Sequence, residues 1–399
     1  MKIYFDNSST TAVSPAVLDE MRPYFLTQYG NASTLHSFGR DARAALDQAR
    51  LGISQIINCN PDEIFFTGCG TESDNLALFG TMAASGSKGH IITTKIEHHA
   101  VLYTAQALQK AGYTVTFLDV DKQGLVSVES VKAAITADTK LVSVMQANNE
   151  VGTLEPIAEI GKMIAELNLN RANKIYFHTD AVQSIGKIAI DVKNLGVDML
   201  SASAHKFNGP KGVGFLYVKR GTNIFPIMYG GHQENGLRPG TENIAEIVGM
   251  AKALQLAYQA HDEAAARLKI MRETLKEGIC GSIEDVSFNG CAACNIGNII
   301  NVSFNYIEGE ALLARLDAHG IAASTGSACA TGSPSHVLAA MGVDPIAAQG
   351  AIRFSFGKDN TLDEVKYTLS VLPKLVNGLR EMSPLWKGGG VNVKARPKN

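Results

Sequence analysis

Several features that would place this chain in a specialised class of protein are missing from its 399 residues. No apolar run approaches the roughly 20 residues that a membrane-spanning helix requires. The net charge of −2 provides no positive surface for binding nucleic acid. The first residues contain no apolar stretch typical of a secretory signal, so we expect a cytoplasmic protein. These absences favour an ordinary globular enzyme.

Cysteine is also scarce, with six residues at positions 59, 69, 280, 291, 294 and 329. Because no secretory signal accompanies them, we do not expect a disulfide framework. Cys291 and Cys294 form a single C-x-x-C, which we interpret as an ordinary loop because no second pair supports it. The chain has neither an HExxH motif nor paired C-x-x-C motifs, so no metal site is predicted. A nicotinamide-binding Rossmann enzyme is disfavoured because no G-x-G-x-x-G opens the first helix.

Short β-rich runs alternate with helical patterns over the first two thirds of the chain. This alternation predicts an α/β fold with a mostly parallel sheet flanked by helices. The runs expected to form the seven strands of this sheet are Ile64–Thr67, His90–Lys95, Thr114–Val120, Lys140–Gln146, Lys174–His178, Met199–Ser203 and Val213–Val218. The last two are joined by a loop too short for a crossover helix, so we expect that pair to be antiparallel.

The chain is too long for one small core, and its second part predicts a separate, smaller α+β domain. A long helical pattern over Ile244–Glu277 is expected to lead into this domain. We predict a large domain over residues 15–256 and a small domain built from residues 1–14 and 257–387. Residues 388–399 are expected to form a flexible tail.

Lys206 and Asp180 are the most informative residues of the chain. Lys206 lies among small and polar residues in Ser201-Ala202-Ser203-Ala204-His205-Lys206, where its amine suits a Schiff base. Asp180 follows an earlier predicted strand and suits the nitrogen of a pyridinium ring. Pyridoxal phosphate chemistry needs both groups, because an amine forms the imine and a carboxylate keeps the ring protonated.

Polar residues near the ends of other strands could complete a cofactor site. The turn at Gly70 and Thr71 leads from a strand into a helix, where amides and a hydroxyl can bind phosphate. A plain helix N-terminus explains the same turn, although Ser203 and His205 beside Lys206 favour the phosphate. His98 is either a polar loop residue or an imidazole that stacks on a cofactor ring and moves protons.

Two residues of the second part also suggest chemistry. Cys329 lies in a small, polar, glycine-containing segment, which is typical of a reactive thiol and differs from the apolar surroundings of a core cysteine. Arg353 lies between apolar residues of a predicted strand, so its charge must be paired or functional. Two roles for Arg353 stay open: a structural ion pair, or bidentate binding of a substrate carboxylate.

Several motifs in this order resemble the cysteine desulfurases of the NifS/IscS group, which are fold-type-I pyridoxal phosphate enzymes of the class V aminotransferase family. The resemblance runs from about Tyr4 to Trp386. Besides the Lys206 and Cys329 segments, it rests on Tyr4-Phe5-Asp6-Asn7-Ser8-Ser9-Thr10-Thr11, Thr71-Glu72-Ser73-Asp74-Asn75, Glu97-His98-His99-Ala100-Val101, Asn148-Asn149-Glu150-Val151-Gly152 and Arg238-Pro239-Gly240-Thr241.

The resemblance implies conversion of L-cysteine to L-alanine, with the sulfur held as a persulfide on Cys329. It assigns cofactor binding to Lys206, Asp180, Gln183, His98, Gly70, Thr71, Asn149, Ser203 and His205, with Thr241 contributed by the other subunit of a homodimer. Catalysis falls to Cys329, Lys206 and His98, and substrate binding to Asn149, Arg353 and Asn31. A sulfur acceptor or iron–sulfur scaffold protein is the implied partner.

Two alternatives stay open beside the desulfurase. One is a selenocysteine lyase, which would differ in details of its pocket, and the other is a sulfur-donor protein whose main role is to bind assembly partners and which has little turnover of its own. An aminotransferase is disfavoured, because that reaction needs no thiol in a polar loop.

Overall fold

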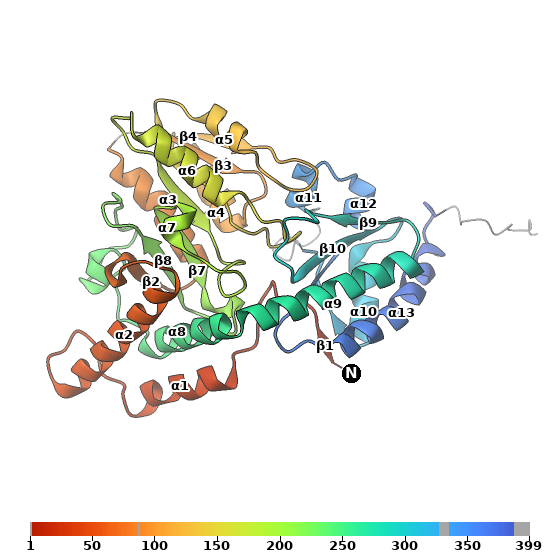
Figure 1. The fold of residues 1–399 in the computed structure, drawn as a ribbon, viewed down its shortest axis with the longest axis horizontal. Coiled ribbons are helices and arrows are strands. Elements are labelled where there is room, and N and C mark those ends of the chain that lie inside the picture. Colours follow the sequence, from red (N-terminus) through yellow and green to blue (C-terminus); the bar gives the residue numbers. More distant parts are fainter. Residues whose placement is uncertain (1, 87, 327–334, 387–399) are drawn as a thin grey trace, which may run out of the picture.

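The computed structural model describes residues 2–86, 88–326 and 335–386 and has an α/β architecture (Figure 1). A seven-stranded sheet with the strand order β2-β8-β7-β6-β5-β3-β4 forms the centre of the larger part. Its strands are β2 (Ile64–Thr67), β3 (His90–Thr94), β4 (Thr114–Leu118), β5 (Thr139–Ser143), β6 (Tyr176–Asp180), β7 (Met199–Ser203) and β8 (Gly214–Val218). Every β-rich run predicted for this sheet therefore overlaps a strand; β2 and β7 match their runs at both ends, and the other strands differ by a few residues.

One strand of this sheet runs against the others. β8 pairs antiparallel with both β7 and β2, whereas β3, β4, β5, β6 and β7 pair in parallel. The expected antiparallel pair is therefore confirmed. Because the other strands share one direction, their carboxyl ends lie at one edge of the sheet, where ligands of open α/β sheets bind.

Both faces of the sheet are buried under helices. Neighbouring residues of a strand point to opposite faces: Leu141 packs in one apolar cluster and Val142 in another. The first cluster includes residues of α3 (Gly70–Ala84) and α4 (His99–Lys110). The second includes residues of α1 (Pro15–Leu26), α2 (Ser37–Ile56), α5 (Val128–Ala134), α6 (Ile157–Asn168), α7 (Val192–Leu195) and α8 (Ile244–Gln259).

The smaller part has its own sheet and its own apolar core. The strands β9 (Val286–Asn289), β10 (Ile299–Phe304) and β12 (Ala351–Ser355) form an antiparallel sheet with β10 in the middle. The helices α9 (His261–Ser282), α10 (Gly309–Ala318) and α13 (Leu362–Arg380) supply buried residues to this core. The helices α11 (His336–Ala340) and α12 (Pro345–Gln349) precede β12. The domain bounds themselves stay a prediction.

The beginning of the chain belongs to the smaller part. β1 (Ile3–Tyr4) pairs in parallel with β11 (Ile321–Ala322), and Phe5 is fully buried in the smaller core. From there the chain passes to the larger part, so that residues just after Phe5 cross between the two. This crossing brings the N-terminal segment to the functional site described below.

The prediction of one continuous helical segment over Ile244–Glu277 is wrong, because the structure has two helices there. α8 ends at Gln259 and α9 begins at His261, and Ala260 between them has a ψ of 8°. The two helices follow each other from the larger to the smaller part (Figure 1). Among the residues described, no helix combines the length and apolar character that crossing a membrane requires.

The interpretation of Cys291 and Cys294 as an ordinary loop without a disulfide is also wrong. Their sulfur atoms are bonded in the loop between β9 and β10. The turn brings their Cα atoms to 5.3 Å from each other, which is within the range that a disulfide spans. The three-residue spacing of the two cysteines is compatible with a turn that brings the thiols together and with one that keeps them apart, so the sequence did not predict the bond.

Candidate active site

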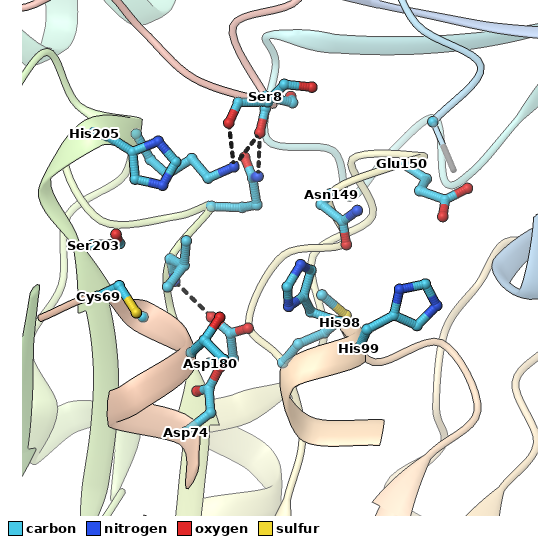
Figure 2. A pocket seen from close by; sticks show the side chains of 18 of the residues that line it. Ser8, Cys69, Asp74, His98, His99, Asn149, Glu150, Asp180, Ser203 and His205 are labelled. Carbon is cyan, nitrogen blue, oxygen red and sulfur yellow. Dashed lines mark hydrogen bonds between the residues drawn. The ribbon is translucent and has the colours of Figure 1, made fainter. Parts of the chain in front are cut away.

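A cavity of about 260 Å³ lies at the carboxyl ends of the parallel strands (Figure 2). Most of the predicted site residues line it together. These are Gly70, Thr71, His98, Asn149, Asp180, Gln183, Ser203, His205, Lys206 and Arg353. Since they come from separate loops of both parts of the chain, the fold has gathered them as the resemblance implied.

Lys206 ends a short 3₁₀ turn (Ala204–Lys206) that follows β7. Its Nζ donates hydrogen bonds to the carbonyl oxygens of Ser8 at 2.6 Å and Ser9 at 2.8 Å. The Ser8 carbonyl also accepts a bond of 2.9 Å from the side chain of Gln183. The N-terminal crossing segment therefore holds the lysine amine in the lining of the cavity.

Asp180 lies at the last position of β6 and is buried. Burial raises its pKa to about 6, although the backbone N–H of Val182 and the charge of Lys206 both act to lower that pKa. The bond from Val182 to Asp180 Oδ1 is 2.9 Å long. Near neutral pH the carboxylate form is therefore available to pair with a protonated ring nitrogen.

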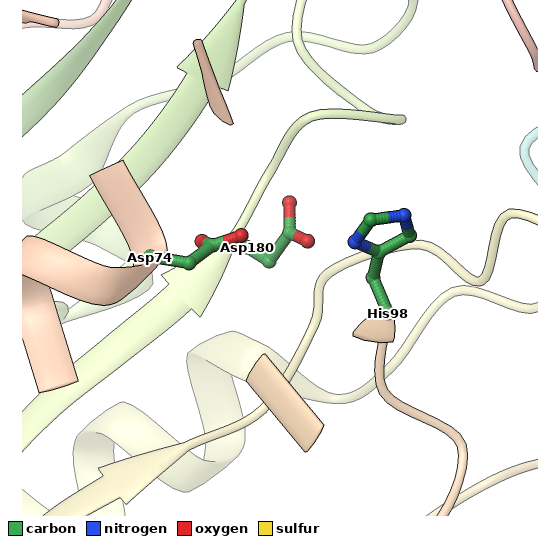
Figure 3. Close-up of side chains that lie close together, drawn as sticks. All are labelled: Asp74, His98 and Asp180. Carbon is green, nitrogen blue, oxygen red and sulfur yellow. The ribbon is translucent and has the colours of Figure 1, made fainter. Parts of the chain in front are cut away.

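Asp74 and His98 lie next to Asp180 (Figure 3), and the polar atoms of the three side chains are within 4.8 Å of one another. Asp74 lies on α3 and is buried, and its pKa is raised by burial and then by the negative charge of Asp180. Two buried carboxyl groups this close do not both ionise readily. We therefore assign the proton to Asp74 and the negative charge to Asp180.

His98 caps the N-terminus of α4, where its Nδ1 accepts a hydrogen bond from the backbone N–H of Ala100 at 3.1 Å. Burial, together with the nearby positive charges of Lys206, His99 and His336, lowers its pKa to about 4. His98 is therefore neutral near pH 7, with the ring proton on Nε2 because Nδ1 accepts. A neutral imidazole in the cavity can take part in proton transfer.

The start of α3 provides a cradle for an anion. A Cβ atom at Gly70 would come within 2.7 Å of Val182 Cγ2, so only glycine lets the helix begin this close to the cavity. Thr71, Ser203 and His205 surround the same helix end, where backbone N–H groups favour phosphate. Together with Lys206 and Asp180, this donor set fits pyridoxal phosphate.

Arg353 lies on β12 and closes the cavity from the smaller part. Its guanidinium donates to Asp6 Oδ1 at 2.7 Å, to Ser9 Oγ at 2.8 Å and to the carbonyl oxygen of Asn149 at 2.8 Å. The structural ion pair that was open for this residue is therefore present. The buried Nε has no hydrogen-bond partner among the described residues.

Comparisons with known proteins agree with this geometry. Residues 3–368 match the family model described as aminotransferase class-V. The chain belongs to the aminotransferase class-V family. A cysteine desulfurase IscS of Clostridium botulinum is 51% identical over 97% of each chain, and one of Dictyoglomus turgidum is 46% identical over 99% of each.

Solved structures of cysteine desulfurase-like proteins also resemble this chain. A NifS-like protein is 40% identical, covers 95% of this chain and 100% of its own, and superimposes with a TM-score of 0.89. A cysteine desulfurase from Thermococcus onnurineus is 26% identical, covers 95% of each chain and has a TM-score of 0.83. The predicted fold, the enzyme class and the cysteine desulfurase function are confirmed.

Three predicted residues of this class-V enzyme are not among those that line the cavity. Asn31 lies in an exposed loop, where its side chain accepts a bond from Ser33. Thr241 lines a separate hollow with Gly68 and Arg238. Cys329 falls outside the described residues, so its role stays a prediction.

Other residues line the cavity that the sequence did not single out for a role. They are Ser8, Ser9, Cys69, Asp74, His99, Met145, Glu150, Val182, Gly326 and His336. Several lie within motifs that carried the resemblance, including Ser8, Ser9 and Asp74. Their position in those motifs was the available signal, but only the fold reveals that the carbonyl groups of the serines, and not their hydroxyls, face Lys206.

Proposed function

We propose that this cavity binds pyridoxal phosphate and L-cysteine and releases L-alanine, while Cys329 takes the sulfur as a persulfide. The observation that carries the proposal is the meeting of a lysine amine, a buried aspartate and a neutral histidine in one cavity. Arg353 on the opposite wall adds a cation for the substrate carboxylate. The resemblance to named cysteine desulfurases over nearly the whole chain supports the same reaction.

The residues around the cavity divide the work of holding the cofactor. Gly70, Thr71, Ser203 and His205 would hold the phosphate, and Lys206 would bind the aldehyde carbon covalently. Asp180 would pair with the ring nitrogen, and Gln183 would bond to the ring hydroxyl. When bound, the protonated ring supplies a sink for the electrons released at the α-carbon of the substrate.

Lys206 and His98 are the proton-transfer groups of the proposal. The Lys206 amine would take the α-proton of the substrate, and Asp180 would stay negatively charged to pair with the ring nitrogen. His98 is neutral near pH 7 because its pKa is lowered to about 4, so its Nε2–H could donate a proton and take it back. After the sulfur has left, the same groups would return a proton to the carbon fragment of the substrate, which then becomes alanine.

Asn149 and Arg353 would orient the substrate. The guanidinium of Arg353 and the amide of Asn149, which both line the cavity, would bond to the carboxylate, and the pairing with Asp6 limits movement of the guanidinium. A charge-assisted bond held at one place is stronger and more selective than a mobile one. This arrangement would direct the β-carbon and sulfur of cysteine away from Arg353.

Sulfur transfer would be an attack by the Cys329 thiolate on the substrate sulfur. The bond between sulfur and the β-carbon breaks, a sulfur–sulfur bond forms, and the carbon fragment leaves as alanine after protonation. The attacking form must be the thiolate, because the thiol is a weak nucleophile. A persulfide produced this way can pass its outer sulfur to an acceptor thiol.

Partners and location extend the proposal. We infer a homodimer in which Thr241 reaches the cavity of the other subunit. A sulfur-acceptor protein, such as an iron–sulfur scaffold, would receive the sulfur, and a cytoplasmic location suits these partners. Asn31 stays a proposed substrate-binding residue.

The deciding experiment measures alanine formed from L-cysteine by the purified protein and traps any persulfide on Cys329. Alanine together with a persulfide at Cys329 supports the whole proposal. The Cys329→Ser variant should keep the colour of bound pyridoxal phosphate and form no persulfide, because imine formation does not use the thiol. A wild-type protein that binds the cofactor and makes neither product would favour the selenocysteine or sulfur-donor alternatives.

A further inference from the structure

The disulfide loop of the smaller part lies directly against the segment that carries Asn149. This segment, residues 148–154, follows β5 and turns at Gly152, whose φ is +76°. A Cβ atom at Gly152 would come within 2.8 Å of the Asn295 side chain, which shows how closely the two loops approach. Thr153 and Asn295 form an isolated β-bridge between them.

Hydrogen bonds join the disulfide itself to residues 148–154. The backbone N–H of Cys291 donates to Thr153 Oγ1 at 3.0 Å, and the backbone N–H of Leu154 donates to the carbonyl oxygen of Cys294 at 2.9 Å. Each cysteine is therefore anchored to the segment through its own backbone. A change in the backbone between positions 291 and 294 would be transmitted to both partners.

The adjacent residues extend this contact toward Asn149. Asn295 Nδ2 donates to the carbonyl oxygen of Val151 at 3.1 Å, and the backbone N–H of Ile296 donates to Gly152 O at 2.9 Å. Val151 lies two positions after Asn149, whose own carbonyl oxygen accepts from Arg353. The path from the disulfide to the cavity is thus a continuous set of short contacts.

The two sulfur atoms differ in ways that suit thiol exchange. Cys291 is 2% exposed, whereas Cys294 is half-buried and follows two exposed alanines. The backbone N–H of Cys294 points at Cys291 Sγ at 3.0 Å, where it would stabilise a negative charge on that sulfur. An incoming thiolate can therefore attack Cys294 and displace Cys291 as a stabilised thiolate.

We propose that Cys291 and Cys294 form an exchangeable dithiol–disulfide site that reacts with small thiols, and that its oxidised form holds residues 148–154 in the substrate-binding arrangement. The effect on substrate rests on the role proposed above for Asn149. A disulfide that closes so short a loop restricts the unfolded chain least, so a local role fits it better than global stabilisation.

The exchange is balanced with a monothiol as the reductant. The first thiolate attacks Cys294 Sγ, which forms a mixed disulfide and leaves Cys291 as a thiolate that takes up a proton. A second thiolate attacks the reductant's sulfur in the mixed disulfide and releases Cys294. Two electrons pass from two small thiols to the protein, which gains two thiols, and the reductant becomes its own disulfide. L-cysteine, the proposed substrate, belongs to this class of thiol.

The first test is a redox titration of the full-length holoenzyme in mixtures of reduced and oxidised glutathione. Thiols are trapped by alkylation, and the peptide containing Cys291 and Cys294 is quantified by mass spectrometry. We expect a reversible transition from disulfide to two alkylated thiols as the reduced fraction rises. A pair that stays entirely oxidised or entirely reduced at every ratio overturns the proposal. The Cys280→Ser variant, which lacks an exposed cysteine elsewhere, should titrate identically.

The second test measures the coupling to the cavity in the Cys329→Ala background, where the proposed catalytic thiol cannot react. The affinity for S-methyl-L-cysteine is read from the absorption of the bound cofactor, with the protein in its oxidised and reduced states. We expect about fivefold weaker binding after reduction, the lower end of typical coupling between sites. Adding Cys291→Ser and Cys294→Ser should give the weaker affinity in both conditions.

The outcomes separate this inference from the proposed function. Equal affinity in the oxidised and reduced states, with normal binding in both, overturns the coupling and leaves the function intact. No binding of the analogue in either state would instead count against the assignment of the cavity. If the double serine substitution prevents folding, the redox titration of the native cysteines still decides the exchange.

Discussion

The floor and the rim of the cavity control charge in opposite ways. The floor consists of the four buried groups Asp74, Glu97, His178 and Asp180, of which Asp74 and Asp180 line the cavity. They lie on α3, just after β3 and on β6, and burial is the main cause of every pKa shift there. The rim, which consists of Asp6, Asn149 and Arg353, keeps a full positive charge that is paired at 2.7 Å. Burial without a partner neutralises a group, whereas burial with a partner preserves its charge.

This difference suits the two halves of the proposed site. Most of the floor remains neutral, so that the one carboxylate at Asp180 acts on the ring nitrogen without competition from Asp74 and Glu97. The rim must attract a substrate carboxylate, which requires a lasting positive charge. Neutralising Asp74 on the floor should therefore be harmless, whereas neutralising Asp6 on the rim should be harmful, and the following predictions test this contrast.

The largest effect is expected at Lys206, which lies between the floor and the rim. Lys206→Ala should lower the rate of alanine formation by about 10³-fold or more, because it removes both the nucleophilic amine and the proposed proton carrier. The absorption band of a covalently bound cofactor should also disappear. Lys211→Ala removes an exposed lysine of the same loop and should change neither signal. A Lys206→Ala enzyme with near-normal turnover would remove Lys206 from the mechanism.

The next largest effect is expected at the rim. Asp6→Asn leaves the buried Arg353 without its anion and should lower the free energy of unfolding by about 3 kcal/mol, the usual cost of breaking a buried pair. Because the guanidinium loses its anchor, KM for L-cysteine should rise more than kcat falls. Asp62→Asn is the matched control, since Asp62 pairs with Arg220 on the surface and should have little effect. Equal destabilisation by both variants would contradict the contrast.

The pH dependence of stability tests the floor. His178 is fully buried, and burial lowers its pKa to about 3, so between pH 3 and 6.5 the unfolded chain binds a proton that the folded chain does not. The contribution of His178 to the free energy of unfolding is fully present above pH 6.5. It decreases as the pH falls, by roughly 1.4 kcal/mol per pH unit at most. His178→Gln should have a shallower loss of stability between pH 6 and 4, measured by urea unfolding. Parallel curves for the two proteins would refute the assigned neutral histidine.

The smallest effect is expected at Asp74. Its pKa is raised in the folded protein, so the folded chain holds a proton that the unfolded chain releases as the pH rises above the usual carboxyl range. Wild-type stability should therefore fall with rising pH through this group, and Asp74→Asn should match the wild type at pH 4 and exceed it modestly at pH 7. Absorption of the bound cofactor should not move. A variant less stable than the wild type at pH 7 would indicate an ionised Asp74.

Much of the architecture could be predicted because its signals are local. Alternating β-rich and helical runs placed the strands of the large sheet, and the short loop after Lys206 required the antiparallel pair of β7 and β8. The break between α8 and α9 at Ala260 was missed, since alanine favours a helix and no local signal marks an end there. The Cys291–Cys294 bond was missed because the turn that pairs the thiols depends on contacts with residues 148–154.

The sequence by itself determined which chemistry is present, because an ordered set of motifs around Lys206, Asp180 and His98 is specific to one enzyme family. The tertiary structure decided how those groups behave. Burial beside Asp180, a property of the folded sheet, keeps the proton on Asp74. The pairing of Arg353 with Asp6 joins residues far apart in the chain. Spacing along a sequence records neither desolvation nor distance in space, and these two quantities set the charges of the cavity.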